Sequence, residues 1–549
     1  MGRVRDAVYK VNKRLTVRLA ATLLAGSMLL SGLLGFFRDR LLNSAYMPNE
    51  AAGLAGYPVG LDAYTAAFTV PDFMFAILVS GALSVTFIPV FNARWVKGNK
   101  QSAWEIGSSM INFMALVTMV VSVLIIIFAN QITSLIVPGF SESAHALTAS
   151  MMRVIAVNPF IFAIAAVIAS IQQAVGRFTF YALAPVMYNV GIIIGIFWFT
   201  QGIKIFGWQV FDGGIMGVAL GVVLGSFLQL IISSVGLIGL GFDYRFKLYW
   251  RNKGFRKVLQ LLPARSVDQG MDYTVSLVEL NLLSRMGAGV TRAYNQALTL
   301  HMMPINLIGV AISSAAFPQL SDRLGEGRQD MFQAQLRQVL RVIIWLALPT
   351  AVITFFTRGY IVHFIRNTGD PLMAGILGAL VIAILFRTIY HMAARVFYAQ
   401  QDTKTPLYIS FVCISLNIIL AIVLSMVLDM GAYGLAWAQS IVAVVEVTIL
   451  FTVMNKRMPR LFNKEFLHAI SRMLIATGIM AIVCYISVVM LPFREADNSF
   501  YSAFPRFLVI VAISFLVYGA MSKLLKLTEV DPIILRLRRV LFARFDVKS

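Results

Sequence analysis

Ionisable side chains lie within two of the most apolar stretches near the start of the chain. Arg38 and Asp39 are adjacent in the first stretch, and Asp62 opens the second. A charge inside a bilayer costs about 2.5 to 3.5 kcal/mol on insertion scales, so charges kept there usually serve a function. We therefore interpret Arg38, Asp39 and Asp62 as candidate functional residues. The alternative, favoured for Arg40, is a side chain that extends to the membrane interface.

The most charged apolar stretch lies at 257–284. Its acids Asp268, Asp272 and Glu279 are spaced by four and seven positions, which places them on one face of a helix. An acidic stripe inside a membrane must face protein or water. The stretch also holds Arg265, and Arg285 follows it. The acidic oxygens could bind a coupling cation, or they could pair with Arg38 or Arg387 from other helices in a structural ion-pair network. Both interpretations stay open.

A second cationic face is predicted further along the chain. Arg387 and His391 are four positions apart, so they share one face of a helix. This face could bind an anionic headgroup, or Arg387 could form a structural ion pair with an intramembrane acid.

Composition indicates what must position these residues. The 549-residue chain is 59% hydrophobic with a mean hydropathy of +0.80, whereas soluble domains are about 45–50% apolar. The net charge of +21 falls mostly between apolar stretches, so it indicates membrane orientation rather than nucleic-acid binding. Cys413 and Cys484 both lie in apolar stretches, which argues against a disulfide framework or a zinc site.

Apolar runs of membrane-spanning length recur along the whole chain. We predict an all-α polytopic membrane protein with about fourteen spans, the first of them retained rather than cleaved as a signal peptide. The predicted spans are 17–42, 62–91, 105–128, 148–173, 180–200, 213–239, 257–284, 290–319, 335–356, 371–400, 406–428, 431–454, 467–491 and 503–524.

The distribution of positive charge supports this count. With fourteen spans, about 32 lysines and arginines fall on the side of the two termini and about 8, Arg292 among them, on the other. The positive-inside rule therefore predicts a protein of the cytoplasmic (inner) membrane with both termini in the cytoplasm.

An internal repeat is visible. Four residues near the end of the second span recur at one constant offset in the eighth: Ser84, Pro89, Arg94 and Gly98 return as Ser313, Pro318, Arg323 and Gly327. Asn189 returns as Asn417 at almost the same offset. A repeat of about six helices brings the chain back to the same side, which predicts two parallel repeats suited to alternating access.

The repeat defines the predicted organisation of the chain. It consists of a basic N-terminus (1–16), an N-lobe (17–240), a C-lobe (241–456), two further helices (457–525) and a basic tail (526–549). Segment 532–545 of the tail interleaves apolar and basic residues, which predicts an amphipathic helix at the membrane surface.

Motifs typical of enzymes are missing from the sequence. It holds no GxxxxGK[ST], HExxH or GxSxG pattern, and its loops are too short for a catalytic domain. We predict that the protein is not an enzyme.

Several motifs resemble those of the MurJ (MviN) lipid II flippases, in order over about residues 17–455. They are LGFFRD at 34–39, DAY at 62–64, FIPVF at 87–91, VPGF at 137–140, GRFTFYALAPVMYN at 176–189, LIGVAISSAAFPQLS at 307–321 and FYAQQDTKTP at 397–406.

The resemblance implies two six-helix lobes plus two helices that form a lipid-facing groove, within the superfamily of multidrug and oligosaccharide-lipid exporters. It implies movement of the undecaprenyl-diphosphate-linked peptidoglycan precursor lipid II from the inner to the outer leaflet. Membrane lipids and cell-wall synthesis enzymes are the other implied partners. Two alternatives stay open. One is export of another polyprenyl-diphosphate-linked glycan or a small molecule, and the other is a transport-dead scaffold.

The resemblance also implies site residues. It implies that Arg38 binds an anion and that Asp39 and Asp62 hold or gate its cavity. Arg38 matches a cavity arginine of the family, whereas its other familiar arginine positions hold Gly32, Phe75, Ala76 and Thr299. The family's sodium site implies a weak candidate cation site at Glu279, Asn417 and Gln439, with Ala421 in place of an acid. No cofactor is expected beyond coupling to Na⁺, H⁺ or the membrane potential.

Overall fold

The computed structural model describes residues 12, 17–46, 59–80, 83–205, 208–366, 369–400, 402, 404–459, 461–492 and 500–531. The side chains of 263–272 lie outside the described part, although their backbone is helical. The predicted amphipathic segment at 532–545 also lies outside it. The chain divides into two compact units, Met1–Arg292 and Ala293–Ser549.

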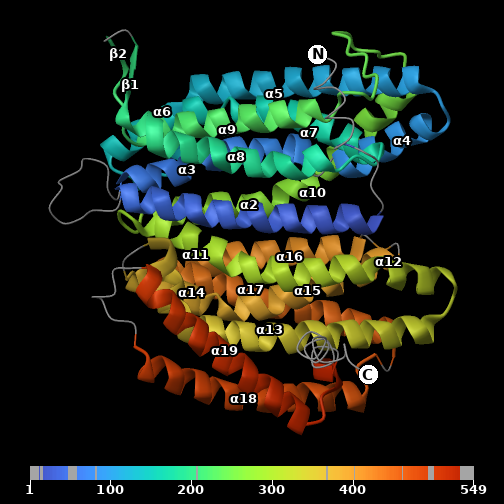
Figure 1. Cartoon of the computed structure of the whole chain (residues 1–549), viewed down its shortest axis with the longest axis vertical. Coiled ribbons are helices and arrows are strands. Elements are labelled where there is room, and N and C mark those ends of the chain that lie inside the picture. Colours follow the sequence, from blue (N-terminus) through green and yellow to red (C-terminus); the bar gives the residue numbers. More distant parts are fainter. Residues whose placement is uncertain are drawn as a thin grey trace, which may run out of the picture. The chain divides into compact units, whose positions relative to one another are not determined.

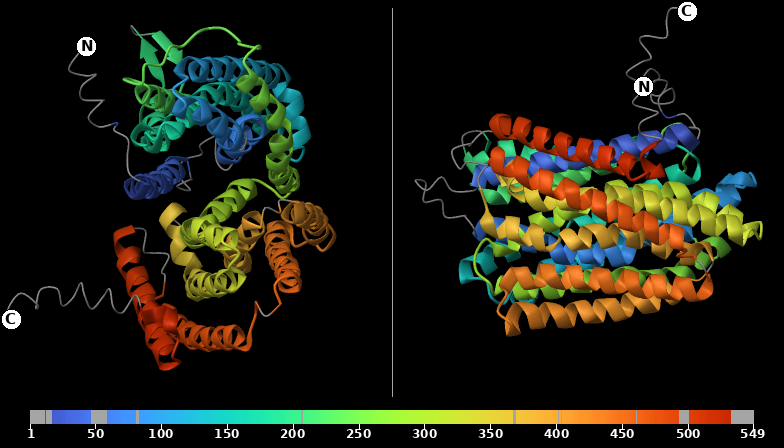
Figure 2. Two further views of the ribbon diagram at one scale, coloured as in Figure 1. Left: turned by 90° about the vertical axis from the view of Figure 1, so that its right-hand side faces the viewer. Right: turned by 90° about the horizontal axis from the view of Figure 1, so that it is seen from below.

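The first unit is a bundle of long helices that run nearly parallel or antiparallel to one another (Figure 2). Two π-helical segments, Ala76–Ser80 and Leu83–Phe87, connect α3 to α4. The helices are α2 (Val17–Tyr46), α3 (Val59–Phe75), α4 (Ile88–Val96), α5 (Lys100–Ile136), α6 (Glu142–Ile155), α7 (Asn158–Ala174), α8 (Thr179–Trp198), α9 (Ile215–Val235) and α10 (Lys253–Ser284).

The second unit repeats this plan and adds two helices, α18 and α19, which pack against each other and against α13 (Figure 1). Two π-helical segments, Ile305–Val310 and Val423–Val427, follow α11 and α16. The helices are α11 (Val290–Pro304), which crosses the unit boundary, α12 (Ala311–Gly325), α13 (Gln329–Arg366), α14 (Pro371–Ala379), α15 (Val381–Ala399), α16 (Lys404–Ile422), α17 (Gly431–Arg457), α18 (Lys464–Met490) and α19 (Phe500–Leu524).

The prediction of an all-α polytopic membrane protein is confirmed. Twelve helical stretches of the described residues are long and apolar enough to cross a membrane, and the long helices α2 and α10 occupy the positions of the two remaining predicted spans. Where a loop was expected, residues 203–211 form a short antiparallel hairpin of β1 (Ile203–Ile205) and β2 (Trp208–Phe211).

Local sequence explains where many helices begin. An Asn, Ser or Asp side chain accepts a hydrogen bond from a backbone N–H in the first turn, which satisfies a group that the helix itself cannot. Such caps are Asn99 before α5, Ser141 before α6, Asn252 before α10, Asp370 before α14 and Asn463 before α18.

The internal repeat is visible in the helices themselves. The π-helical segments that begin at Ala76 and Ile305 are separated by the same offset as Ser84 and Ser313. The fourth predicted span of each repeat is broken, between α6 and α7 and between α14 and α15. Equivalent helices also share neighbours: α8 packs on α9 as α16 packs on α17, and α5 packs on α7 as α13 packs on α15.

The two compact units do not divide at 240/241, where the sequence places the boundary between lobes. The first unit continues through α10 because this helix packs on α5 and on the π-helical segment Ala76–Ser80. The predicted lobe boundaries describe the repeat, whereas the compact units describe packing.

Helices α8 and α9 approach each other more closely than side chains would allow. Gly191 and Gly195 of α8 face Gly221 and Gly225 of α9. A Cβ added at Gly195 would lie 2.5 Å from the Cα of Gly221. Small residues spaced by four are the usual means of bringing membrane helices into backbone contact.

Asp402, just before α16, stabilises the start of that helix. Its carboxylate accepts hydrogen bonds from the backbone N–H groups of Lys404 and Thr405 and from the Thr405 hydroxyl, and it forms a 2.6 Å ion pair with Arg457. The bonds from Thr405, with the guanidinium of Arg457, hold the pKa of Asp402 below its usual range. A lowered pKa in the folded state stabilises the fold above the ordinary aspartate pKa of about 4, and this contribution is lost as the pH falls further.

We therefore expect Asp402→Ala to lower the free energy of unfolding by about 1 kcal/mol near neutral pH, as lost helix caps do. The measurement is thermal unfolding of purified protein between about pH 3 and pH 7. The difference from wild type should shrink toward the acid end. Asp402→Asn, which keeps an acceptor, should lose less. An equal deficit at every pH would contradict this account.

Candidate functional site

The first candidate site is built on Arg38 and Asp39, neighbours in α2. The Arg38 Nη2 lies 3.0 Å from the Asp39 Oδ1, and the Arg38 Nη1 donates a 3.0 Å hydrogen bond to the Asn189 Oδ1 on α8. Asp39 is buried, whereas 22% of the Arg38 side chain is exposed. The guanidinium is thus oriented from one side and accessible from another.

Asn189 is held in one orientation by its own hydrogen bonds, and it therefore also orients Arg38. Its Nδ2 donates to the Ser31 hydroxyl at 3.1 Å and is also within hydrogen-bond distance of the Pro185 carbonyl. The amide oxygen therefore points at Arg38. The sequence identified Asn189 only as a marker of the repeat, because its partners on α2 are distant along the chain.

Arg292 completes this cluster. Its Nη2 lies 3.5 Å from the Asp39 Oδ1 and 3.5 Å from the Asn43 Oδ1. Only 6% of its side chain is exposed, and its buried Nε has no hydrogen-bond partner among the described residues. The sequence counted Arg292 among the cations of the outer side, at the start of the predicted span 290–319. The structure places it in the first turn of α11, buried against α2.

Asp62, predicted to hold or gate the cavity, accepts hydrogen bonds from the backbone at the start of α11. Its Oδ1 accepts from the Arg292 N–H at 2.7 Å, and its Oδ2 accepts from the Gly289 N–H. These N–H groups cannot bond within their own helix. Asp62 therefore orients the turn that carries Arg292, and its carboxylate is occupied by the backbone.

The arrangement of these residues is suited to binding an anion. Two guanidinium groups, from Arg38 and Arg292, share a single carboxylate oxygen of Asp39. One retains an unused buried donor and the other is partly exposed. Guanidinium groups with unused N–H donors in a poorly hydrated site bind phosphate or diphosphate oxygens strongly. We name Arg38, Asp39, Arg292 and Asn189 the Arg38 cluster.

The second unit carries its own cationic face, on α15. Arg387 forms a 2.8 Å ion pair with Glu446 of α17, and its guanidinium lies over the Tyr390 ring. The structural ion pair considered for Arg387 is therefore present, although 30% of its side chain stays exposed. The sequence did not single out Glu446, which lies two helices further along the chain.

This face extends beyond Arg387. His391 and Arg395 follow at intervals of four, so the three side chains form one stripe, which we name the α15 stripe. Arg395 donates a 2.8 Å hydrogen bond to the Ser314 hydroxyl and lies over the Phe317 ring. No acid within the described residues pairs with Arg395. A stripe with more positive than negative charge in a membrane favours an anionic ligand.

The residues of the candidate cation site belong to both units. Glu279 is buried in α10 of the first unit, whereas Asn417 (buried, α16) and Gln439 (partly buried, α17) belong to the second. The Asn417 Oδ1 is buried and has no hydrogen-bond partner in the part of the chain that the structure describes, which suits an oxygen ligand of a cation. Among the described residues, no three His, Cys, Asp or Glu side chains are grouped as metal ligands.

Three further residues of α10 were predicted as site residues. The side chains of Arg265, Asp268 and Asp272 lie outside the described part of the chain. The acidic stripe therefore stays a prediction.

Asp72 was not predicted as a site residue from the sequence. It follows Pro71 inside α3, is partly exposed, and has no hydrogen-bond or ion-pair partner among the described side chains. Tyr64 and Tyr188 lie close enough to interact electrostatically with both Asp72 and Arg38. The available signal was an acid directly after a proline in an apolar run.

The repeated bundles, the broken fourth helices and the buried cations define a polytopic transporter fold. Solved structures with this fold include an inward-facing MATE multidrug transporter of the MOP superfamily, with a TM-score of 0.61 and 14% identity over 77% of this chain and 99% of that one. A lipid II flippase MurJ in an inward closed conformation aligns with a TM-score of 0.73 and 24% identity, covering 92% of this chain and 98% of that one.

The sequence comparisons agree on the family. The family model described as "Lipid II flippase MurJ" matches residues 52–527, so the chain belongs to the MurJ family. A probable lipid II flippase MurJ from Thermotoga maritima is 24% identical over 92% of this chain and 96% of its own. The lipid II flippase MurJ from Burkholderia cenocepacia is 24% identical over 79% and 83%.

Proposed function

We propose that the protein is a flippase for lipid II, the undecaprenyl-diphosphate-linked peptidoglycan precursor, and moves it from the inner to the outer leaflet of the cytoplasmic membrane. Membership of the MurJ family supports the substrate class. The observation that carries the proposal is the Arg38 cluster. Its two guanidinium groups share one carboxylate oxygen and keep donors for a diphosphate.

In this proposal the residues of the chain bind and orient; none takes part in a reaction. Arg38 and Arg292 bind the diphosphate, Asp39 keeps the two guanidinium groups together, and Asn189 fixes the orientation of Arg38. In the second unit, the α15 stripe is a separate candidate for binding an anionic headgroup. The site is exposed alternately to the two sides of the membrane, with both termini in the cytoplasm, as the charge asymmetry suggests.

We further propose that a cation or the membrane potential drives the cycle. In the first unit, Glu279 is the candidate ligand because it is a buried carboxylate in a membrane helix. In the second unit, Asn417 is a separate candidate because its buried amide oxygen has no partner among the described residues. Na⁺ prefers oxygen ligands of this kind, and a proton would bind the Glu279 carboxylate.

Complementation tests the proposal. A host depleted of its own lipid II flippase would express this chain, and lipid II in the outer leaflet would be cleaved by an enzyme added outside the cells. We expect cleavage to return to the level of undepleted cells. Absence of rescue by folded, membrane-inserted protein would contradict the proposed substrate and favour another lipid-linked glycan or a scaffold.

The same assay in reconstituted vesicles separates the driving forces. Replacing Na⁺ with choline should slow flipping if Na⁺ is coupled, and Glu279→Gln should remove that dependence. Flipping that responds only to an imposed membrane potential, equally in wild type and Glu279→Gln, would contradict a cation site at Glu279.

A further inference from the structure

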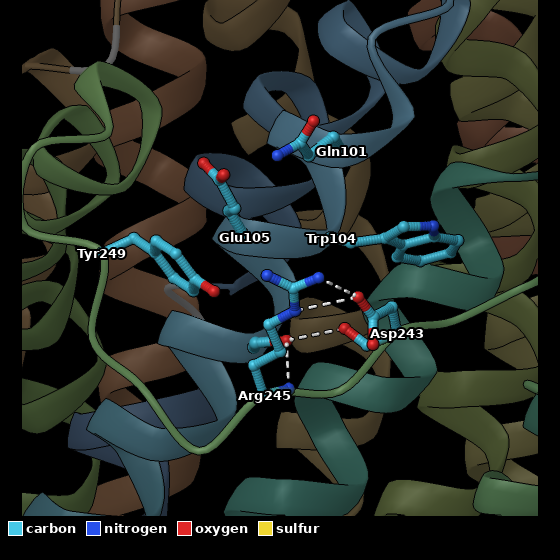
Figure 3. A pocket seen from close by; sticks show the side chains of 7 residues that line it. Gln101, Trp104, Glu105, Asp243, Arg245 and Tyr249 are labelled. Atoms are coloured by element: carbon cyan, nitrogen blue, oxygen red, sulfur yellow. Dashed lines mark hydrogen bonds and ion pairs between the residues drawn. The ribbon is translucent and has the colours of Figure 1, made fainter.

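A pocket of about 230 Å³ lies at the start of α5, far along the chain from the Arg38 cluster (Figure 3). One wall is α5 and the other is the segment between α9 and α10. The lining residues are Gln101, Trp104, Glu105, Ser108, Asp243, Arg245 and Tyr249.

The pocket is preformed because its loop is fastened to α5. Polar side chains on one face of α5 bond to the loop. Ser108 accepts from the Arg245 N–H at 3.3 Å, Ser109 accepts from the Tyr249 N–H at 2.9 Å, and the Asn112 Nδ2 donates to the Arg245 carbonyl at 2.9 Å. The loop therefore keeps its shape without a ligand.

Both signs of charge line this pocket. Arg245 forms a 2.8 Å ion pair with Asp243, and both side chains are well exposed. Tyr249 lines the same pocket with its hydroxyl group as a further hydrogen-bonding group. Glu105 accepts a 2.9 Å hydrogen bond from Asn252 through Oε2, and its Oε1 has no hydrogen-bond partner among the described residues. One guanidinium and two carboxylates thus lie around a single small volume, as Figure 3 shows.

The pocket lies at the first residues of a candidate membrane span, where lipid headgroups are expected. From Gln101 to Ser108, α5 rises about 10 Å, which passes through the polar layer, about 5 to 7 Å thick on each side of a bilayer. The span that contains these residues begins at Lys100. A ligand there is in contact with the membrane surface.

The loop residues next to the pocket lining are of the types that concentrate at a membrane interface. Phe246 is 90% exposed, and Tyr244 and Trp250 are also exposed. Lys247 and Arg251 alternate with these aromatic residues. Aromatic rings concentrate at the headgroup level, and basic residues bind lipid phosphates. These loop residues therefore fit the acyl and phosphate region of a phospholipid.

From these observations we infer that the pocket binds the headgroup of an aminophospholipid, with phosphatidylethanolamine as the simplest example. Arg245 and Tyr249 bind the phosphate, Glu105 and Asp243 accept hydrogen bonds from the primary ammonium, and Phe246 contacts the acyl region. An anionic lipid without an amine would bring no positive charge to the carboxylates of Glu105 and Asp243. A choline headgroup has no N–H to donate to them. The inference does not depend on lipid II as the transported substrate.

The test is lipid binding to the purified, delipidated full-length protein in detergent, measured by native mass spectrometry. Dioleoyl phosphatidylethanolamine, phosphatidylcholine and phosphatidylglycerol would be compared. We expect phosphatidylethanolamine to bind about tenfold more tightly than phosphatidylcholine, the value of about one charge-assisted hydrogen bond. Equal binding of the two, or strongest binding of phosphatidylglycerol, would overturn the inference.

Two conservative variants test whether the acidic residues cause the preference for phosphatidylethanolamine. Glu105→Gln and Asp243→Asn keep the shape and remove the charge, so each should reduce the preference for phosphatidylethanolamine to about twofold or less. Glu142→Gln, which removes an exposed carboxylate in the first turn of α6 and outside the pocket lining, is the matched control and should keep the preference. A preference retained in both acidic variants would overturn the assignment of the ammonium site.

A last comparison separates a lipid from a soluble headgroup. Glycerophosphoethanolamine has the same charged groups without acyl chains. It should bind more weakly than the lipid. Phe246→Ala should weaken binding of the lipid and leave binding of glycerophosphoethanolamine unchanged. Equal binding of both molecules to wild type would overturn the assignment to a membrane lipid.

Discussion

Arg38→Ala is expected to abolish lipid II flipping in the outer-leaflet assay while the protein still reaches the membrane at wild-type levels. Arg38 is the accessible guanidinium of its cluster, and it is held in place by Asp39 and Asn189. Truncating one partner of a desolvated, hydrogen-bonded charge pair costs about 2 to 5 kcal/mol. Binding of a diphosphate should therefore weaken about 30-fold or more. Transport at physiological substrate levels would fall below detection.

Two further variants make this result specific. Arg38→Lys keeps the charge but loses the planar fork that reaches Asp39 and Asn189 together, so it should restore only part of the activity. Arg40→Ala is the matched control, because the sequence assigns that neighbour to the membrane interface. Normal flipping by Arg38→Ala would show that the cluster does not bind the substrate and would favour the α15 stripe alone.

Asp62→Ala is expected to lower the stability of the protein most among single substitutions near the site. The carboxylate accepts hydrogen bonds from the backbone N–H groups of Gly289 and Arg292. Removing it leaves the buried N–H of Arg292 and the partly buried N–H of Gly289 without this acceptor. The loss of a partner costs about 1 to 3 kcal/mol for a buried donor and less for a partly buried one. The free energy of unfolding should therefore fall by about 2 to 5 kcal/mol, measured by denaturant titration in mixed micelles.

The partial replacement Asp62→Asn keeps one acceptor oxygen and should recover roughly half of this loss. Asp212→Ala, at an exposed position, is the control and should change stability by less than about 0.5 kcal/mol. If Asp62→Ala unfolded like wild type but failed to flip lipid II, Asp62 would act on the substrate rather than on the start of α11. The two readouts together thus distinguish a capping role from a gating role.

Much of the fold could be predicted because it depends on local patterns. Apolar length alone was enough to place the long helices, and residue identities such as Pro89 and Pro318 were enough to find the repeat. The breaks between α6 and α7 and between α14 and α15 were not predicted. Pro159, at the start of α7, was the available signal for the first break, whereas no proline marks the second break at Leu380.

The site was less accessible to sequence reasoning because its contacts are distant along the chain. Arg292 lies at the start of the predicted span 290–319, so its charge was counted on the outer side of the membrane. Its burial depends on Asp39 and Asp62, which lie near the opposite end of the first unit's sequence. Likewise, Arg387 could be recognised as a cation in a span, but nothing local indicated that Glu446 would pair with it.

The glycine contact between α8 and α9 has a mechanical consequence. Where backbones touch, no side chain can change rotamer to let one helix slide or tilt against the other. Repeat-equivalent positions in the second unit carry Ile419, Val423, Ala438 and Val442 instead. We therefore expect α8 and α9 to move as one stiff rod during transport. The equivalent helices α16 and α17 lack this glycine contact, and the π-helical segment Val423–Val427 follows α16. We expect this pair to bend more easily, so the two repeats should differ in stiffness.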